Sequence, residues 1–380
     1  MKKILVVHTK YRNLGGEDTA VLNEVKTLKQ SFLVKEVLFQ NSINNFFNDL
    51  FGLLRGKNAH SKKLLRNEIE MFSPDVIYIH NTWFKASVSV LELLDEVRIK
   101  SYLKLHNYRY ICSSTFFASK HTGRGNFCNL CGFKRGKNQI FNKVSEESTI
   151  KSFFQIIYGI KYLKFLNKTS TQILVLTNFH RDLINKKVNL KKDPEILNNC
   201  LDETSVSIQN TKINQIIYAG RVSKEKGIEE LIQSFNLINN NKYTLKIIGD
   251  GPMLEYLEKK YTNEEIIFTG YLKNEIVLNE ISKSKAAITT TKLVEGQPMF
   301  IIESLRHGVP IIVPDRGGLK ELLPNKYNLV YKNTEELVEK LNLIQNENFI
   351  NDIAKDINNH FKNNFSNKKY IESAKRIFNE

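Results

Sequence analysis

The 380-residue sequence predicts an α/β protein built from two doubly wound, Rossmann-like domains with a cleft between them. Short β-branched runs alternate with longer amphipathic stretches along most of the chain, a pattern typical of βαβ units and parallel sheets. The alternation starts again near residue 213, and the chain is longer than a single hydrophobic core usually supports. We therefore expect two parallel sheets, each covered by helices on both faces.

In the first half, the runs expected to form strands span residues 3–8, 34–39, 75–80, 101–106 and 172–177. In the second half, the expected strands span residues 215–220, 244–249, 265–270, 286–291 and 310–314, with helices between them. The polar stretch 202–212 lacks periodicity and is expected to be a hinge. The predicted organisation is an N-terminal domain over 1–205, a second domain over 206–362, and a helix over 363–380 that crosses back to the first domain.

Charge is distributed unevenly between the two halves. The net charge is +16, and residues 1–200 contain 32 Lys and Arg against 16 Asp and Glu, which leaves 24 of each for residues 201–380. An excess of that sign favours an anionic partner such as a phosphate-bearing substrate, an acidic membrane surface or nucleic acid. Segments 51–66 and 150–168 mix aromatic and aliphatic residues with Lys and Arg, as interfacial helices do, although a core-facing stripe also explains each one alone.

The number of cysteines and the N-terminal residues predict the cellular compartment of the protein. Four cysteines do not make a disulfide framework, and the apolar run at residues 4–7 is too short for a signal peptide. We expect a cytoplasmic protein that docks peripherally on the inner face of the cell membrane. A C-x2-C pair with a third cysteine and a histidine is a weak candidate for a structural zinc site, formed by Cys112, His121, Cys128 and Cys131.

Three loops carry the chemistry. Gly15 and Gly16 precede a helix that begins near Thr19, and exposed N–H groups at a helix N-terminus bind phosphate. A tight turn at the two glycines, with Asp18 capping the helix, also fits. After the strand that ends near residue 220, Arg221 and Lys226 flank a short loop where two cations can converge on a diphosphate.

The third loop runs from Glu295 into a helix that starts near Pro298 and contains Glu303. A carboxylate on an otherwise apolar helix is costly unless it is bonded, and carboxylates are strong acceptors for sugar hydroxyls. The backbone N–H groups of Gly296, Gln297 and Met299 can serve a phosphate.

Together these segments resemble the retaining glycosyltransferases of GT-B architecture known as glycosyltransferase group 1. The matching positions are Gly220, Arg221, Lys226 and Gly227, then Gly249, Gly251 and Pro252, the Glu-x7-Glu pair Glu295 and Glu303, Gly308, Pro310 and Ile312, and finally Gly317, Gly318 and Glu321. In the first half the match is looser. Gly15 and Gly16 match the family's first loop and His106 matches its His-Asp segment, with Asn107 in place of the usual aspartate.

The resemblance implies a role for each position. Arg221 and Lys226 would neutralise the donor diphosphate, His106 would face the reacting sugar, and Glu295 would hold that sugar; these four are the expected catalytic residues. The expected donor-binding residues are Gly15, Gly16, Gly249, Gly251, Gly296, Gln297, Pro298, Met299 and Glu303, the last of them on the ribose.

The implied reaction is the retaining transfer of a hexose or N-acetylhexosamine from a UDP- or GDP-linked donor to a hydroxyl of a glycan or lipid-diphosphate-linked acceptor. This would belong to the assembly of bacterial surface polysaccharide: O-antigen, capsule or exopolysaccharide. No Asp-x-Asp pair occurs in a suitable loop, so we expect no metal and no cofactor. Two other classes stay open: a sugar-nucleotide epimerase on the same architecture and a basic nucleic-acid-binding protein. The paired glutamates argue against nucleic acid as a partner.

Overall fold

The computed structural model describes residues 1–11, 15–40, 58–112, 149–203, 212–238 and 243–379. The described residues form two compact units. One comprises residues up to Cys200 together with those from Tyr370 onward, and the other comprises Leu201–Lys369. The chain thus leaves the first unit near its middle and returns to it at its C-terminal helix.

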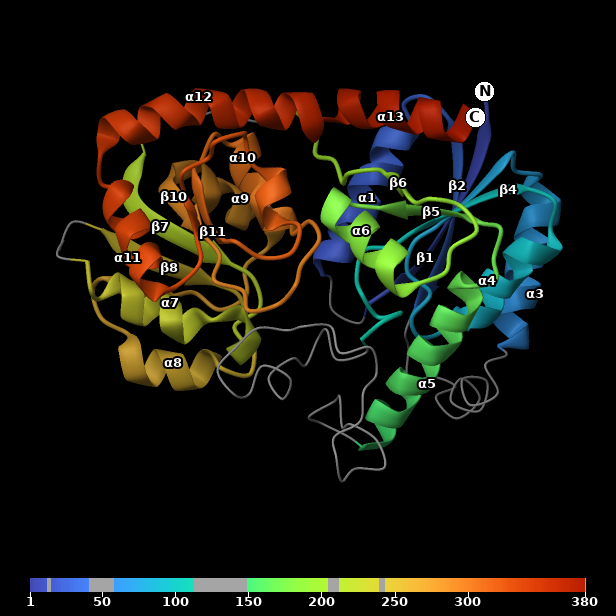
Figure 1. Cartoon of the computed structure of the whole chain (residues 1–380), viewed down its shortest axis with the longest axis horizontal. Helices are drawn as coiled ribbons and strands as arrows, with labels where there is room; N and C mark the ends of the chain where they lie inside the picture. Colours follow the sequence, from blue (N-terminus) through green and yellow to red (C-terminus); the bar gives the residue numbers. More distant parts are fainter. Residues whose placement is uncertain (12–14, 41–57, 113–148, 204–211, 239–242, 380) are drawn as a thin grey trace. The chain divides into compact units, whose positions relative to one another are not determined.

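The first unit contains a parallel six-stranded sheet of order β2-β1-β3-β4-β5-β6 (Figure 1). Its strands are β1 (Lys3–Lys10), β2 (Leu33–Gln40), β3 (Val76–Ile79), β4 (Lys100–Lys104), β5 (Gln172–Val175) and β6 (Glu195–Ile196). The helices between them are α1 (Gly16–Leu28), α3 (Ala59–Phe72), α4 (Ser87–Glu96), α5 (Thr149–Leu166) and α6 (Asn178–Lys187).

The core of this unit explains why the C-terminal helix belongs to it. Helix α1 buries Val21, Val25 and Leu28 at helical spacing against β1 and β3. Helix α13 (Asn367–Asn379) adds Tyr370, Ala374, Ile377 and Phe378 to the same cluster. The ring of Phe378 lies 5.2 Å from that of Tyr78 on β3 and 5.0 Å from that of Tyr102 on β4. The hydrophobic core around the first sheet is therefore completed by residues from the C-terminal end of the sequence.

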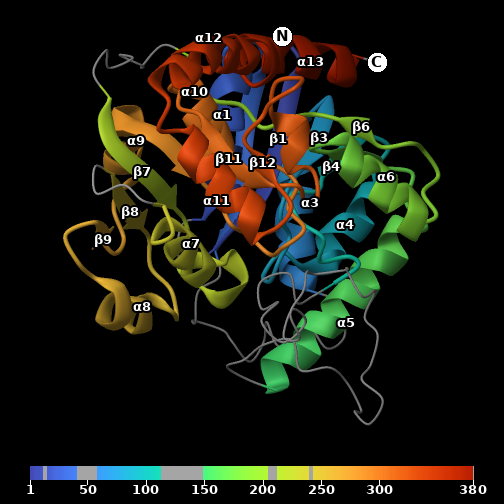
Figure 2. The same ribbon diagram turned by 60° about the vertical axis from the view of Figure 1, so that its left-hand side comes forward.

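The second unit contains another parallel six-stranded sheet, of order β12-β11-β10-β7-β8-β9. Its strands are β7 (Ile213–Ala219), β8 (Thr244–Ile248), β9 (Ile266–Phe268), β10 (Ser284–Ile288), β11 (Ile311–Pro314) and β12 (Val330–Tyr331). Its α-helices are α7 (Ile228–Phe235), α8 (Leu254–Tyr261), α9 (Asn274–Lys283), α10 (Met299–Arg306), α11 (Thr334–Leu343) and α12 (Glu347–Asn364). Helices α7 and α11 pack on one another, and α10 packs on α9 and α12 (Figures 1 and 2).

Each sheet has a point at which the strand order reverses. In the first sheet this point lies between β1 and β3, and in the second it lies between β7 and β10. Open α/β sheets bind ligands beyond the carboxyl ends of the strands at such switch points. The loops that follow β1, β3, β7 and β10 are therefore the candidate binding segments.

The predicted fold class is confirmed: both sheets are parallel and doubly wound. Every expected strand is present, whereas β6 and β12 have two residues each and gave no periodic signal. The C-terminal region contains a break, since α12 ends at Asn364 and α13 begins at Asn367. Most of the expected hinge lies outside the described residues. Within the described part of the chain, no helix has both the length and the apolar character that a membrane span requires.

Candidate functional site

The loops after β7 and β10 are held together at the switch point of the second sheet. The β7 loop passes through a short 3-10 helix, η2 (Lys224–Lys226), and reaches α7 through Gly227, whose φ is +69°. A Cβ at Gly227 would lie 2.3 Å from the carbonyl oxygen of Thr290 in the β10 loop. The Thr290 hydroxyl donates to the carbonyls of Lys226 and Gly227, at 2.9 Å each. Only glycine permits this close approach.

The close approach joins two of the predicted site residues. Lys226 Nζ lies 2.5 Å from Glu295 Oε1, and the Thr291 hydroxyl donates to the same oxygen at 2.6 Å. The side chains of Lys226 and Glu295 are only 23% and 17% exposed. The backbone N–H of Gly318 donates to the backbone carbonyl of Glu295 at 3.0 Å. The ammonium predicted to meet a diphosphate is therefore neutralised by the carboxylate predicted to meet the sugar.

The β8 loop lies against the β7 loop. A Cβ at Gly249, where φ is +137°, would lie 1.8 Å from the carbonyl oxygen of Gly220. Val222 N–H donates to the Asp250 carbonyl, and Gly251 lies directly after Asp250. Arg221 is exposed in this pair of loops. The structure thus brings three predicted loop residues, Gly249, Gly251 and Arg221, to one edge of the sheet.

Glu303 is buried on α10. The residue is only 6% exposed. Burial raises the pKa of the Glu303 carboxyl to about 7, and the nearby positive charge of Arg306 opposes this with a smaller effect. Pro298 is the N-cap of α10, and Gly296, Gln297 and Met299 are buried around that helix start. A carboxyl group with this pKa changes its charge close to neutral pH, so its strength as an acceptor depends on pH.

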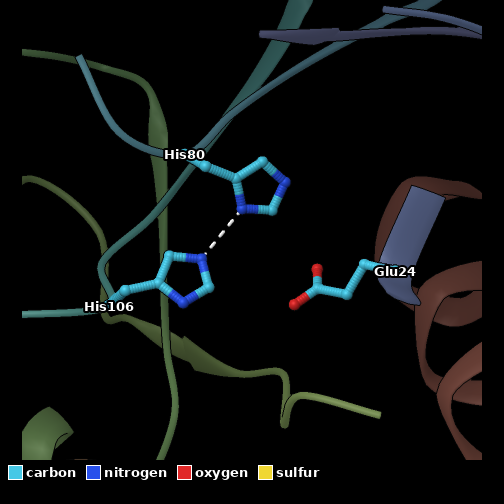
Figure 3. A group of neighbouring side chains, drawn as sticks. All are labelled: Glu24, His80 and His106. Carbon is cyan, nitrogen blue, oxygen red and sulfur yellow. Dashed lines mark hydrogen bonds between the residues drawn. The ribbon is translucent and has the colours of Figure 1, made fainter. Parts of the chain in front are cut away.

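In the first unit, the structure brings two strand-end histidines together. His80 follows β3 and His106 follows β4, and His80 Nδ1 lies 2.9 Å from His106 Nε2 (Figure 3). His80 is 2% exposed, whereas His106 is half-buried. Both line a pocket at the carboxyl ends of β3 and β4, whose wall also includes Glu17, Asn81, Thr82, Asn107, Arg109 and Tyr158.

Behind the histidines lies a buried ion pair. Lys104 Nζ is 2.5 Å from Glu24 Oε1, and both side chains are fully buried. Glu24 Oε2 accepts the hydroxyls of Tyr78 and Tyr370 at 2.7 Å each, so the pair also ties α13 to α1. Burial lowers the pKa of Lys104, and Glu24 opposes that effect.

Within the described residues, one group of possible metal ligands is close enough to share an ion: Glu24, His80 and His106, whose ligand atoms lie within 4.8 Å of one another. Figure 3 shows the Glu24 carboxylate facing the two rings. That carboxylate already accepts hydrogen bonds from Lys104 and two tyrosines. A divalent ion would have to displace a buried ammonium, so this donor set does not suit a metal. For the predicted zinc site, Cys112 is buried, and His121, Cys128 and Cys131 lie outside the described residues.

The N-terminus of α1 has a carboxylate partner within the chain. Gly15 N–H donates to Asp18 Oδ2 at 3.0 Å, and His8 Nε2 lies 2.8 Å from Asp18 Oδ1. Asp18 is 1% exposed. Gly15 is the N-cap of α1, and Asp18, in the first turn, binds the N–H of Gly15, so the part of Gly15 and Gly16 in donor binding stays a prediction.

Sequence reasoning missed the buried pair Glu24–Lys104 and the contact between His80 and His106. The sequence contained one indication of the Glu24–Lys104 pair. Residues two apart on a strand share a face, so Lys104 lies on the face of Tyr102, a core residue. A lysine in that position requires a buried partner.

Comparisons with known proteins agree with this architecture. Residues 202–375 match the family described as "Glycosyl transferases group 1". An uncharacterized glycosyltransferase of Methanocaldococcus jannaschii is 26% identical over 254 residues, covering 62% of this chain and 65% of that protein. The amylovoran biosynthesis glycosyltransferase AmsD of Erwinia amylovora is 26% identical over 137 residues, covering 34% of this chain and 38% of its own length.

Among solved structures, Anabaena HepE in complex with UDP and glucose superposes with a TM-score of 0.69 at 15% identity, over all of both chains. A superposition of this quality at such low sequence identity establishes the fold alone. Residues 202–375 thus match the group 1 glycosyltransferase family, and the two parallel six-stranded units have the GT-B fold.

Proposed function

We propose that this protein is a retaining glycosyltransferase that moves a sugar from a nucleoside-diphosphate donor to a hydroxyl of a glycan or lipid-linked acceptor. The observation that carries the proposal is the Lys226–Glu295 pair at the switch point of the second sheet. A part-buried cation beside a carboxylate offers one group for a diphosphate and one for sugar hydroxyls in the same loop cluster.

The chemistry follows from where charge develops. Departure of a nucleoside diphosphate leaves oxocarbenium character on the sugar and negative charge on the phosphate. Lys226, Arg221 and the N–H groups around the start of α10 would stabilise that negative charge. A leaving phosphate oxygen can then accept the proton of the attacking hydroxyl, which enters on the face that the leaving group vacates. Because two side-chain cations serve the diphosphate, the proposal includes no metal ion.

The pocket of the first unit presents groups that pair with the hydroxyls of an acceptor. Its wall combines the Glu17 carboxylate, the amides of Asn81 and Asn107, and the rings of Tyr158 and Tyr162. Amides and carboxylates pair with hydroxyl groups, and aromatic rings cover the apolar face of a sugar. A relative named for amylovoran biosynthesis supports a bacterial polysaccharide as the product.

Donor binding is testable without knowledge of the acceptor. A thermal-shift screen against UDP-, GDP-, ADP- and dTDP-sugars should reveal one base that raises the melting temperature, since a ligand that binds the native state stabilises it by mass action. We expect a UDP- or GDP-linked sugar to give the largest shift. If none of these four donor classes shifts the melting temperature at millimolar concentration, the donor assignment is wrong.

We also propose that the first unit docks on an anionic bilayer through α5. Ile150, Phe153 and Ile160 on this helix are 66%, 45% and 51% exposed. Lys164 and Lys168 are exposed further along. Apolar side chains that enter the interface beside cations that meet acidic headgroups are typical of helices lying on a membrane.

Vesicle sedimentation tests this docking. Changing Ile150 and Ile160 together to serine should weaken binding to phosphatidylglycerol-containing vesicles by about tenfold, because each isoleucine loses transfer free energy at the interface. The matched control is Ile213→Ser, which alters a 50% exposed isoleucine in the second unit. Equal binding by both variants, or equal binding of the native protein to neutral vesicles, would exclude α5 as an anionic docking face.

A further inference from the structure

The half-buried His106, which the family resemblance places against the reacting sugar, has a second histidine beside it. His80 Nδ1 lies 2.9 Å from His106 Nε2, and the two rings are 5.2 Å apart and tilted by 32°. Both histidines line the pocket, and His80 is the more deeply buried of the two; Figure 3 shows the hydrogen bond between their rings. One nitrogen of His106 is thus committed to His80, and among the described residues no hydrogen bond engages the other, which can therefore meet a ligand.

His80 is a fixed partner. Its backbone N–H donates to the Val7 carbonyl at 3.0 Å, and its ring packs 4.3 Å from Tyr78 and 6.2 Å from His8 at an interplanar angle of 86°. His8 is in turn held by Asp18. Close packing of this kind restricts the imidazole to one rotamer.

The charged and titratable groups around the two rings favour neutral imidazoles. Burial lowers the pKa of both His80 and His106, and the positive charge of Lys104 and the neighbouring His8 lower both further. His180 on α6 acts on His106 in the same direction, while Glu24 on α1 is engaged by Lys104 and two tyrosines.

A hydrogen bond between two neutral imidazoles needs one N–H and one lone pair. His80 Nε2 is buried, with no hydrogen-bond partner among the described residues. A buried lone pair without a partner is tolerated better than a buried N–H without an acceptor. We therefore place the His80 proton on Nδ1, where it is donated to His106 Nε2, which leaves the His106 proton on Nδ1.

We propose that His80 is a positioning residue that fixes His106 as the neutral Nδ1–H tautomer, so that His106 presents a hydrogen-bond donor to the reacting sugar. The tautomer rests on the hydrogen-bond geometry of the two buried rings and on their neutral state, and its use rests on the proposed function. A neutral donor can hold a sugar hydroxyl without placing a positive charge beside an oxocarbenium-like centre. An imidazolium would oppose that charge.

The test combines imidazole NMR with kinetics on the full chain. With ¹⁵N-labelled histidine, His106 should show a protonated Nδ1 in the native protein and in His80→Asn, since an Asn side-chain amide can place an N–H near the position of Nδ1. His80→Gln, which places its amide near the position of Nε2, should give a mixture of His106 tautomers. It should lower kcat by about tenfold to a hundredfold at a nearly unchanged donor KM, and His80→Asn should recover most of that loss.

The control is His180→Asn, which removes another buried imidazole, one whose Nε2 is paired with Tyr110 at 2.8 Å. It should leave the tautomer of His106 unchanged. A native His106 protonated at Nε2, or a single unchanged tautomer in His80→Gln, would overturn the inference. If His80→Gln does not fold, the native spectrum and His80→Asn still decide. The expected spectra without any sugar transfer by the native protein would instead refute the proposed function.

Discussion

Lys226→Ala is expected to lower kcat/KM for the nucleotide-sugar donor by about 10²–10³-fold, the loss typical when one donor to a developing anion is removed. The Lys226 side chain is only 23% exposed, so its charge acts in surroundings that screen it less than water does. Steady-state kinetics with the donor identified by the thermal-shift screen measure this loss.

Changing the partner carboxylate, Glu295, should affect nucleoside diphosphate affinity in the opposite direction to changing Lys226. In the free protein Glu295 neutralises Lys226 at 2.5 Å, so a diphosphate must compete with Glu295 for the ammonium. Glu295→Gln removes that competition. It should leave the affinity for free nucleoside diphosphate unchanged or raise it, while transfer falls by orders of magnitude because a sugar-holding acceptor is lost. Lys226→Ala should weaken nucleoside diphosphate binding. Calorimetry on both variants shows whether the effects have opposite signs.

A matched ion pair in the same unit is the control. Lys246 Nζ lies 2.6 Å from Glu280 Oε2, and their side chains are 20% and 16% exposed, close to the values for Lys226 and Glu295. Lys246→Ala should leave kcat/KM for the donor near the native value. An equal loss in Lys246→Ala and Lys226→Ala would mean that either change only disturbs the fold, and near-native transfer by Lys226→Ala would remove it from the site.

Glu303→Gln is expected to weaken donor binding by about 30-fold or more at pH 8, as hydrogen bonds from ribose hydroxyls to a charged acceptor are replaced by weaker ones. The native protein should show a pH dependence that the variant lacks. Because the pKa of Glu303 is about 7, its carboxylate is protonated below neutrality and ionised above it. Donor affinity should therefore rise between pH 6 and 8 in the native protein and stay flat in Glu303→Gln.

The same variant has an opposite effect on stability. A carboxyl pKa raised from 4.5 in the unfolded chain to about 7 in the fold costs stability as pH rises from 4.5 to 7. The cost reaches about 3 kcal/mol above pH 7. Glu303→Gln should thus melt at a temperature no lower than the native protein at pH 8. Loss of both donor affinity and stability would indicate a structural role for Glu303 instead.

The parts of the site that lie in one stretch of sequence could be predicted from it. Glu295 and Glu303 stand eight residues apart around a helix start, and the structure begins α10 at Met299. The expectation for Lys226 came from its loop alone. Its pairing with Glu295, 69 residues away, depends on β7 and β10 being neighbours in the sheet, and strand order has no local signal.

The first unit shows the same limit. His106 stood out because it matches the His-Asp segment of the family that the sequence resembles, but its bond to His80 needs the register of β3 against β4. The Lys104 pair was hidden because its partner Glu24 comes from α1, and Glu24 is in turn bound by tyrosines of β3 and the C-terminal helix α13. The contact of Tyr370 with Glu24 spans 346 residues. The partners of such a buried charge are identified only when the core is assembled.

The central claim is sugar transfer with release of a nucleoside diphosphate, and ¹H NMR of a single reaction mixture tests it most directly. The native protein, its stabilising nucleotide sugar and a glycan acceptor are followed in the presence of EDTA. We predict the appearance of nucleoside diphosphate together with a new glycosidic linkage that has the anomeric configuration of the donor. Interconversion of the sugar nucleotide without release of nucleoside diphosphate would indicate an epimerase, and a product of inverted configuration would contradict the retaining mechanism.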